Sequence, residues 1–138
     1  MTREIIVEEA KSWVGTPYHA MGKVKGAGVD CGQILIEVFG NAGIVEKFDT
    51  GYYPIDFNMH SHEQSYFKFV EQYAHTIDKP KNGDIVLYKF GRLISHSGII
   101  VDVENKMIVH ALMDVGVIMS QWDEGDLKDR IVGFWSVF

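Results

Sequence analysis

The chain has 138 residues, of which 46% are hydrophobic and 12% aromatic, and its formal net charge is −6. This length and composition predict a single globular domain over residues 1–138 and exclude a disordered chain. The negative charge argues against a protein that binds nucleic acid or an anionic surface through bulk positive charge.

The first half of the sequence predicts helices separated by loops. Apolar residues recur at helical spacing over residues 3–14, and Gly15, Thr16 and Pro17 end that helix. Residues 18–29 contain three glycines and predict a long loop. Further amphipathic patterns predict helices over residues 31–42 and 62–74.

The second half has the composition of short strands. It is rich in β-branched and aromatic residues, and its strands are expected at residues 84–90, 96–103, 106–112, 116–122 and 131–138. Helices followed by adjacent strands indicate the α+β class, with N-terminal helices packed on one side of a five-to-six-stranded antiparallel sheet.

The only cysteine, Cys31, lies at the start of the second predicted helix. One cysteine excludes an internal disulfide. Asp30 is a favoured N-cap residue and would leave Cys31 in the first turn, where the helix dipole favours a thiolate and backbone N–H groups can hold an oxyanion. The bland alternative is that Cys31 is a small buried hydrophobic residue.

A thiol nucleophile needs a base, and two of the six histidines stand at marked positions. His96 opens one predicted strand and His110 lies inside the next. In an antiparallel hairpin they share a face only if paired residue numbers have an even sum. A two-residue loop would separate them, whereas a three-residue loop or a bulge would set them about 7 Å apart on one face.

The motif HSH at residues 60–62 has the spacing of a metal site, but a polar helix start is the better explanation because no cysteine lies nearby. No metal and no cofactor are therefore expected. Either of His96 and His110 alone would be read as a hydrogen-bonded structural residue. Their combination with a cysteine at a helix start favours thiol catalysis.

Four segments in this order resemble the NlpC family of papain-like cell-wall cysteine peptidases, and most closely its small phage tail-associated type. They are GTPYHAMGKVKGAGVDCGQILIEVFGNAGI, GDIVLYKF, ISHSGIIVD and MIVHAL. The resemblance implies a papain-like core and cleavage of peptide bonds in peptidoglycan stem peptides, typically between D-glutamate and a diamino acid.

By the same resemblance, Cys31 is the nucleophile, His96 its general base and acid, and His110 the residue that orients His96. Tyr18 would lie beside the cysteine and help the oxyanion site or the substrate. Asp30 would receive a free amino group of the substrate besides capping the helix.

One departure from the family concerns Gly32. The family usually reads Asp-Cys-Ser-Gly, whereas this chain reads Asp30-Cys31-Gly32-Gln33. Gly32 has no hydroxyl with which to contact a substrate, so the family's substrate preference is in doubt. The separation of His96 and His110 is also slightly long for the family, which suggests a longer hairpin loop.

The expected partner is a peptidoglycan stem peptide, with phage tail proteins as further partners if a phage encodes the chain. Neither a signal peptide nor a run of 18 apolar residues is present, so we expect a protein of the cytoplasm or of a virion tail and no membrane span. Three alternatives are a structural tail-assembly protein, an amide or acyl hydrolase of another small substrate, and a redox-sensing thiol. The last is weakened because a resolving cysteine is missing.

Overall fold

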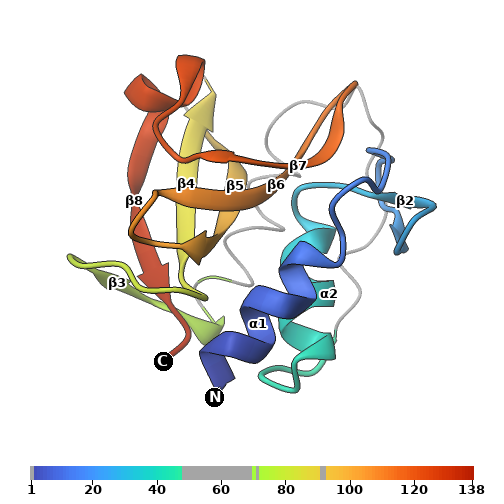
Figure 1. The fold of residues 1–138 in the computed structure, drawn as a ribbon, viewed down its shortest axis with the longest axis horizontal. Coiled ribbons are helices and arrows are strands. Elements are labelled where there is room, and N and C mark those ends of the chain that lie inside the picture. The colour runs from blue at the N-terminus through green and yellow to red at the C-terminus, as the bar shows by residue number, and fades with distance from the viewer. Residues whose placement is uncertain (1, 48–69, 71, 91–92) are drawn as a thin grey trace.

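The computed structural model of the chain describes residues 2–47, 70, 72–90 and 93–138. Two α-helices, α1 (Thr2–Lys11) and α2 (Gln33–Asn41), lie together beside a sheet, as Figure 1 shows. Ile6, Ala10 and Trp13 form the buried side of α1 and its following turn, as their spacing predicts. The side chains from Gln33 to Phe39 are all buried, so α2 is the central helix.

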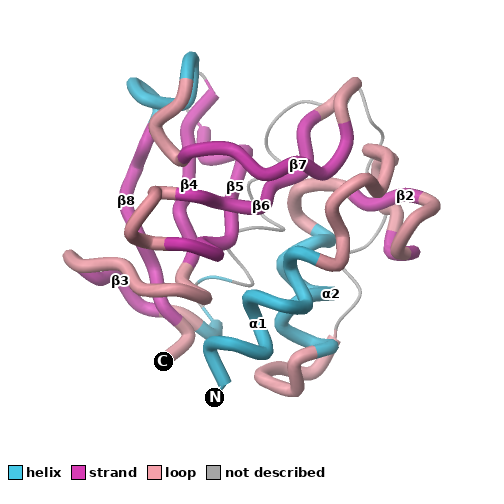
Figure 2. Tube along the Cα trace, in the orientation of Figure 1, coloured by secondary structure: helices cyan, strands magenta, loops and turns pink. Residues whose placement is uncertain are grey.

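The large sheet is antiparallel and has six strands in the order β3-β8-β4-β5-β6-β7. Figure 2 shows the strands in magenta, with the helices α1 and α2 in cyan beside them. A 3₁₀ helix, η1 (Gly125–Arg130), precedes the last strand. The strands are β3 (His75–Ile77), β4 (Ile85–Phe90), β5 (Leu93–Asp102), β6 (Met107–Leu112), β7 (Gly116–Gln121) and β8 (Ile131–Ser136). This architecture confirms the α+β class.

The two faces of the sheet bury different sets of side chains. On the helix side, residues such as Leu87, Ile99 and Val109 pack with α1 and α2 in the larger core cluster, which also contains Cys31. Val86 and Ile108 belong to a smaller cluster on the opposite face. Neighbouring residues of one strand thus enter different clusters, as the alternation of strand side chains requires.

Three short strands, β1 to β3, and the 3₁₀ helix η1 were not foreseen from the sequence. The loop predicted at residues 18–29 contains a small hairpin, β1 (Lys23–Val24) paired with β2 (Gly28–Val29). The helix predicted over 62–74 falls mostly outside the described residues, as does the HSH motif at 60–62. His75 begins β3, where it pairs with Ser136. The partner strand β8 supplies hydrogen bonds that the local sequence does not reveal.

The β5–β6 hairpin settles the question of which face the two histidines occupy. Asp102 pairs with Met107, but Ile100 pairs with Ile108 because the register shifts by one residue between them. The numbers of paired residues therefore sum to 208 beyond this bulge, which is the even sum that places His96 and His110 on one face.

Neither α1, with 10 residues, nor α2, with 9, approaches the roughly 20 residues that a membrane-spanning helix needs. Within the described ranges, no helix qualifies as a membrane span.

Candidate active site

Cys31 lies at the N-terminal end of α2, and its side chain is buried with an exposed fraction of 5%. The regular helix begins at Gln33, two residues later than predicted. Gly32 nevertheless has helical φ and ψ, and the N–H of Ile34 donates to the carbonyl of Asp30 at 3.0 Å. The helical turn therefore starts at Asp30, and Cys31 occupies its first position as the sequence predicts.

The carboxylate of Asp30 is a hub of backbone hydrogen bonds. Its Oδ1 accepts the N–H groups of Gly32 at 3.0 Å and Gln33 at 2.8 Å, and its Oδ2 accepts that of Met21 at 2.7 Å. The first two bonds are those of a helix N-cap, and the third ties the preceding loop to the helix. The N–H groups of Gly32 and Gln33 already donate to Asp30. An oxyanion would have to compete with this carboxylate for them, contrary to the simple expectation from the sequence. The role of Asp30 toward a substrate amine stays a prediction.

Tyr18 lies beside the cysteine, as the family resemblance implies. Its hydroxyl is 3.8 Å from the sulfur of Cys31, and its backbone forms a parallel bridge with Val29. The N–H of His19 donates to the carbonyl of Val29 at 3.0 Å, which holds this loop against the segment that leads into α2. A polar O–H group is therefore fixed next to the thiol.

The strand that carries His96 is joined to the cysteine by its next residue. Ser97 is fully buried, and its hydroxyl donates to the carbonyl of Cys31 at 3.1 Å. His96 itself pairs with Tyr88 of β4, at the point where the β4–β5 register shifts. The close approach of the Cys31 thiol to His96 stays a prediction from the sequence.

The two strand histidines are in direct contact. His96 Nε2 and His110 Nδ1 are 2.9 Å apart and share a hydrogen bond, so Nδ1 is the ring nitrogen of His96 that is turned away from His110. The other nitrogen of His110, Nε2, is 2.7 Å from the hydroxyl oxygen of Ser120 on β7. These contacts confirm the prediction that His110 meets one nitrogen of His96.

Both histidines are buried, and two aromatic rings lie against His96. The rings of Tyr88 and Phe90 lie 5.6 Å and 5.8 Å from the His96 ring, centre to centre. Burial, and then the neighbouring His110, lowers the pKa of His96 to about 3. Burial also lowers the pKa of His110 to about 4. Both imidazoles are therefore neutral at pH 7, and a neutral imidazole can accept a proton.

Two features could have pointed to Ser97 and Ser120, which were not predicted from the sequence as site residues. Ser97 is a small polar residue inside an apolar strand, and buried hydroxyls need a partner. Ser120 lies two residues from Ile118, which pairs with His110, so the alternation of strand faces puts Ser120 beside His110. The pairing of β6 with β7 had to be known before this parity could be used.

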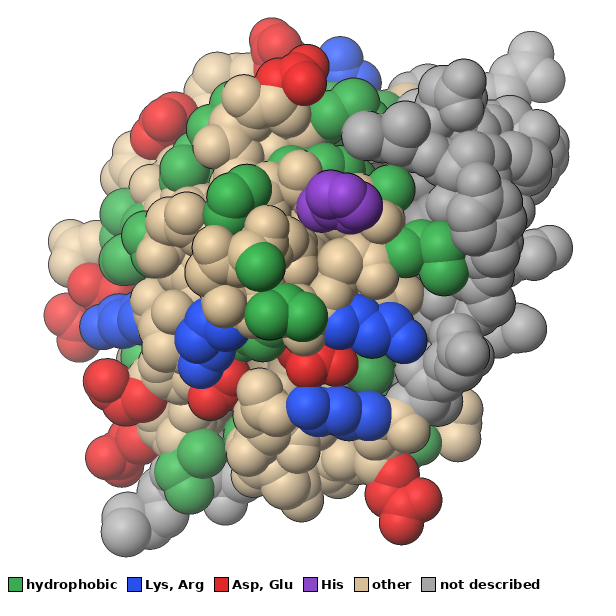
Figure 3. Space-filling view, turned by 90° about the vertical axis from the view of Figure 1, so that its right-hand side faces the viewer, with side chains coloured by type: hydrophobic (Ala, Val, Ile, Leu, Met, Phe, Trp, Pro, Cys, Tyr) green, Lys and Arg blue, Asp and Glu red, His purple; other side chains and the backbone are tan. Residues whose placement is uncertain are grey.

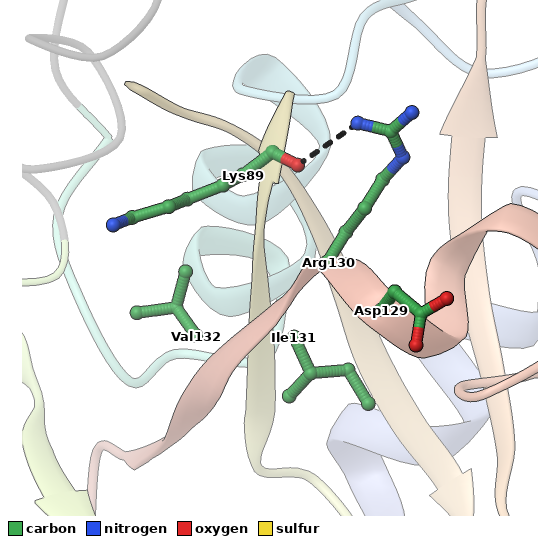
Figure 4. Close-up of a pocket in the computed structure, with 5 residues that line it drawn as sticks. All are labelled: Lys89, Asp129, Arg130, Ile131 and Val132. Carbon is green, nitrogen blue, oxygen red and sulfur yellow. Dashed lines mark hydrogen bonds between the residues drawn. The ribbon is translucent and has the colours of Figure 1, made fainter. Parts of the chain in front are cut away.

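The described part of the chain contains no group of three or more His, Cys, Asp or Glu side chains that could hold a metal ion. A cavity of about 390 Å³ lies between Lys89 of β4 and residues 129–132, and Arg130 donates to the carbonyl of Lys89 at 3.5 Å (Figure 4). This cavity contains none of the predicted site residues.

The surface on the β2 side carries side chains of several kinds. Figure 3 shows basic and acidic side chains next to one another across the middle and lower part of this face, with hydrophobic groups between them and histidine above them. Charges of both signs are therefore mixed here, in keeping with a modest net charge of −6.

Comparison with solved structures shows the same fold in three proteins that are described as NlpC/P60 proteins. A protein of the NLP/P60 family from Staphylococcus aureus, described as similar to a lipoprotein, aligns with 99% of this chain at a TM-score of 0.69 and 19% identity. An NlpC/P60 family protein from Bacillus cereus aligns with 96% at a TM-score of 0.71 and 14% identity. The chain spans only 41% and 39% of these two proteins.

The third structure is the NlpC/p60 domain of the peptidoglycan hydrolase SagA. It aligns with 86% of this chain and 88% of its own length, at a TM-score of 0.57 and 21% identity. No curated protein matches the chain. The sequence model of the NlpC/P60 family matches residues 15–136, a range that contains Cys31, His96 and His110. With the family's fold and a family match over most of its length, the chain belongs to the NlpC/P60 family.

Proposed function

We propose that the chain is a cysteine peptidase that cleaves peptide bonds in peptidoglycan stem peptides. The observation that carries this proposal is the buried contact at 2.9 Å between His96 of β5 and His110 of β6. Ser97, the residue after His96, donates its hydroxyl hydrogen bond to the backbone carbonyl of Cys31. Membership of the NlpC/P60 family and the likeness to a domain of a peptidoglycan hydrolase support the cell wall as the source of the substrate.

In the proposed first half-reaction, Cys31 attacks the carbonyl carbon of the scissile amide. The proton of the thiol passes to Nδ1 of His96 while the sulfur–carbon bond forms. His96 then gives this proton to the nitrogen of the leaving amine, the carbon–nitrogen bond breaks, and a thioester on Cys31 remains. His110 orients the His96 ring through the hydrogen bond between its own Nδ1 and Nε2 of His96.

In the second half-reaction, water replaces the amine. His96 takes a proton from the water as its oxygen attacks the thioester carbonyl, and the same proton returns to the sulfur when the carbon–sulfur bond breaks. The products are a carboxylic acid and the restored thiol. The cycle needs no cofactor, since both half-reactions balance with one proton shuttled by His96.

The oxyanion that forms in both steps needs a hydrogen-bond donor. The Tyr18 hydroxyl, 3.8 Å from the sulfur of Cys31, is the described side chain placed to supply one. The N–H groups of Gly32 and Gln33 are bonded to Asp30, so we do not assign them this role.

We infer that the scissile bond lies between D-glutamate and a diamino acid, as the family resemblance implies. A digest of purified peptidoglycan and of free stem peptides, analysed by mass spectrometry, tests this. The wild type should release L-Ala–D-Glu from free stem peptides, and from intact wall it should leave L-Ala–D-Glu attached to the glycan, whereas Cys31→Ala should cut neither substrate. Failure of the wild type to cut either substrate would overturn the proposed activity.

A finer question is whether the enzyme prefers stem peptides with a free amino terminus. A carboxylate at Asp30 favours a cationic group, and Gly32 lacks the hydroxyl that would add a contact. We expect kcat/KM to be higher for a free stem peptide than for its N-acetylated form, by up to about tenfold. Equal values would leave Asp30 with its structural role alone and would favour an enzyme that cuts intact wall, as expected of a phage tail.

A further inference from the structure

The hydroxyl of Ser120 adds a third member to the polar chain formed by His96 and His110. We propose that Ser120 is a positioning residue that holds His110, and through it His96, in the tautomers that thiol catalysis requires. This inference rests on the proposed peptidase function, but the arrangement of protons that it predicts can be measured without a substrate.

The proposal starts from two short contacts in a buried setting. His110 has an exposed fraction of 1% and Ser120 of 8%. Ser120 Oγ is 2.7 Å from His110 Nε2, and His110 Nδ1 is 2.9 Å from His96 Nε2. The Ser120 hydroxyl is also 3.4 Å from the carbonyl oxygen of Gln121, which can accept its proton.

A neutral imidazole carries one proton on its two nitrogens, so the protons along this chain of contacts can be arranged in two ways. In the first, Ser120 donates to Gln121, accepts from Nε2 of His110, and leaves Nδ1 of His110 to accept from Nε2 of His96. In the second, every proton points the other way: Ser120 donates to Nε2 of His110, and Nδ1 of His110 donates to Nε2 of His96.

Only the first arrangement makes His96 a base. It leaves Nδ1 of His96 without a proton, and this is the nitrogen turned away from His110 and assigned to the thiol. In the second arrangement Nδ1 of His96 already carries the proton. His110 and His96 separate the Ser120 hydroxyl from the thiol. The orientation of this hydroxyl nevertheless decides whether His96 can accept the proton of Cys31.

The first arrangement is also the only one that tolerates a protonated His96. After it accepts the thiol proton, His96 carries hydrogens on both nitrogens, and Nε2 must donate to its neighbour. His110 can accept only if its own proton is on Nε2, and that proton needs the oxygen of Ser120. Without this acceptor, a buried N–H of His110 would lack a partner, which is unfavourable by itself.

The described surroundings offer few other polar groups that could set which ring nitrogen of each histidine carries the proton. Burial keeps both neutral, and the rings around His96 are those of Tyr88 and Phe90, which offer it π faces and edges. The Tyr88 hydroxyl donates to the carbonyl of Trp122 at 2.7 Å, so it is already engaged. Among the described contacts of the pair, the Ser120 hydroxyl is the polar group at its far end.

The direct test is the position of the protons. Two-bond ¹H–¹⁵N correlation spectra at pH 7, assigned with His96→Gln and His110→Gln, report which ring nitrogen of each histidine carries its proton. We expect Nε2–H for both in the wild type and a shift of His110 to Nδ1–H in Ser120→Ala. Nδ1–H at His110 in the wild type, or no change in Ser120→Ala, would overturn the proposal whatever the activity of the protein.

Kinetics provides the second test, with Ser136→Ala as the matched control. Ser136 is another buried serine of the same sheet, on β8, and its hydroxyl accepts the N–H of Phe138 at 3.1 Å. Ser120→Ala should lower kcat by about 10- to 100-fold and change KM less than about twofold, because the transition state alone needs a charged His96. Ser120→Thr should restore most of kcat, and Ser136→Ala should retain it.

Two outcomes would count against the kinetic part. If Ser120→Ala and Ser136→Ala lose activity equally, Ser120 contributes only to folding. If Ser120→Ala changes KM and leaves kcat intact, the hydroxyl acts on binding. If Ser120→Ala does not fold, the wild-type spectra together with the kcat of Ser120→Thr still decide the question.

Discussion

At the scale of single residues, the site is built from groups that are far apart in the sequence. The Ser97–Cys31 hydrogen bond spans 66 positions, and the contact between His96 and His110 spans 14. The sequence marks Cys31 and His96 through local motifs, whereas Ser97 and Ser120 are marked only by their partners. Two predictions belong at this scale.

The first concerns the reactivity of Cys31, which is the only thiol in the chain. If His96 takes the thiol proton, iodoacetamide should label the native protein at pH 6.5, and His96→Ala should slow labelling by about tenfold or more. Labelling is read by intact mass. His75→Ala, which removes an exposed histidine on β3, is the control and should label like the wild type. Equal rates in all three proteins would exclude the Cys31–His96 pair.

The second concerns Asp30, whose carboxylate accepts three backbone N–H groups. Asp30→Ala leaves these donors without their partner and should lower the free energy of unfolding by about 3 kcal/mol. The stability of Asp30→Asn should lie between those of the wild type and Asp30→Ala. Urea denaturation measures the loss. Asp126→Ala, at an exposed position of η1, should stay within about 0.5 kcal/mol of the wild type. A loss at Asp30 no larger than that of the control would refute the structural role.

At the scale of elements, the β5–β6 hairpin determines whether the two histidines meet. The four residues between Asp102 and Met107 would by themselves give an odd sum of paired numbers, and the bulge before Asp102 makes it even. Gly98 lies on the same face as His96, and a Cβ there would lie 2.6 Å from Cδ1 of Ile108 and 3.3 Å from Cγ1 of Val86. This glycine therefore permits close packing beside the histidine.

The prediction for this element compares two glycines of the same sheet. Gly98→Ala should lower the free energy of unfolding by about 1–3 kcal/mol, because Ile108 must move to make room. Gly133→Ala on β8 meets only the Trp135 ring, at 3.5 Å, and should be neutral or stabilising by about 0.5 kcal/mol. Thermal or urea unfolding measures both. Equal stability of the two variants would show that the space at Gly98 is not tight.

At the scale of the whole molecule, the sheet separates two core clusters and holds a pair of buried titratable groups, His96 and His110, on one of its faces. Folding transfers both histidines from water into this environment, which lowers the pKa of His96 to about 3 and that of His110 to about 4. An unfolded chain binds protons at these positions near pH 6.5, whereas the folded chain does not. Stability therefore depends on pH in a direction that can be worked out.

Because the unfolded state binds more protons below pH 6.5, the histidine contribution is complete above that pH and is lost as the pH falls toward 4. At pH 4.5 each histidine should lower the free energy of unfolding by about 2–3 kcal/mol relative to pH 7.5. Urea unfolding at the two pH values measures this. Between these pH values His110→Gln should lose about half as much free energy of unfolding as the wild type. An equal loss in the two proteins would contradict the assignment of this pH dependence to the histidine pair.

The sequence by itself determined the elements that depend on local pattern. The helix at α2 follows from its apolar stripe and from Asp30, and the alternating segments near residues 84–136 predict the strands of the sheet. Only the tertiary structure decided what depends on pairing between distant segments. Local residues cannot specify that β3 joins β8, that a bulge after Ile100 sets the register, or that Ser120 meets His110. A one-residue shift between strands moves every side chain to the other face, so the site exists only once the whole sheet has selected its register.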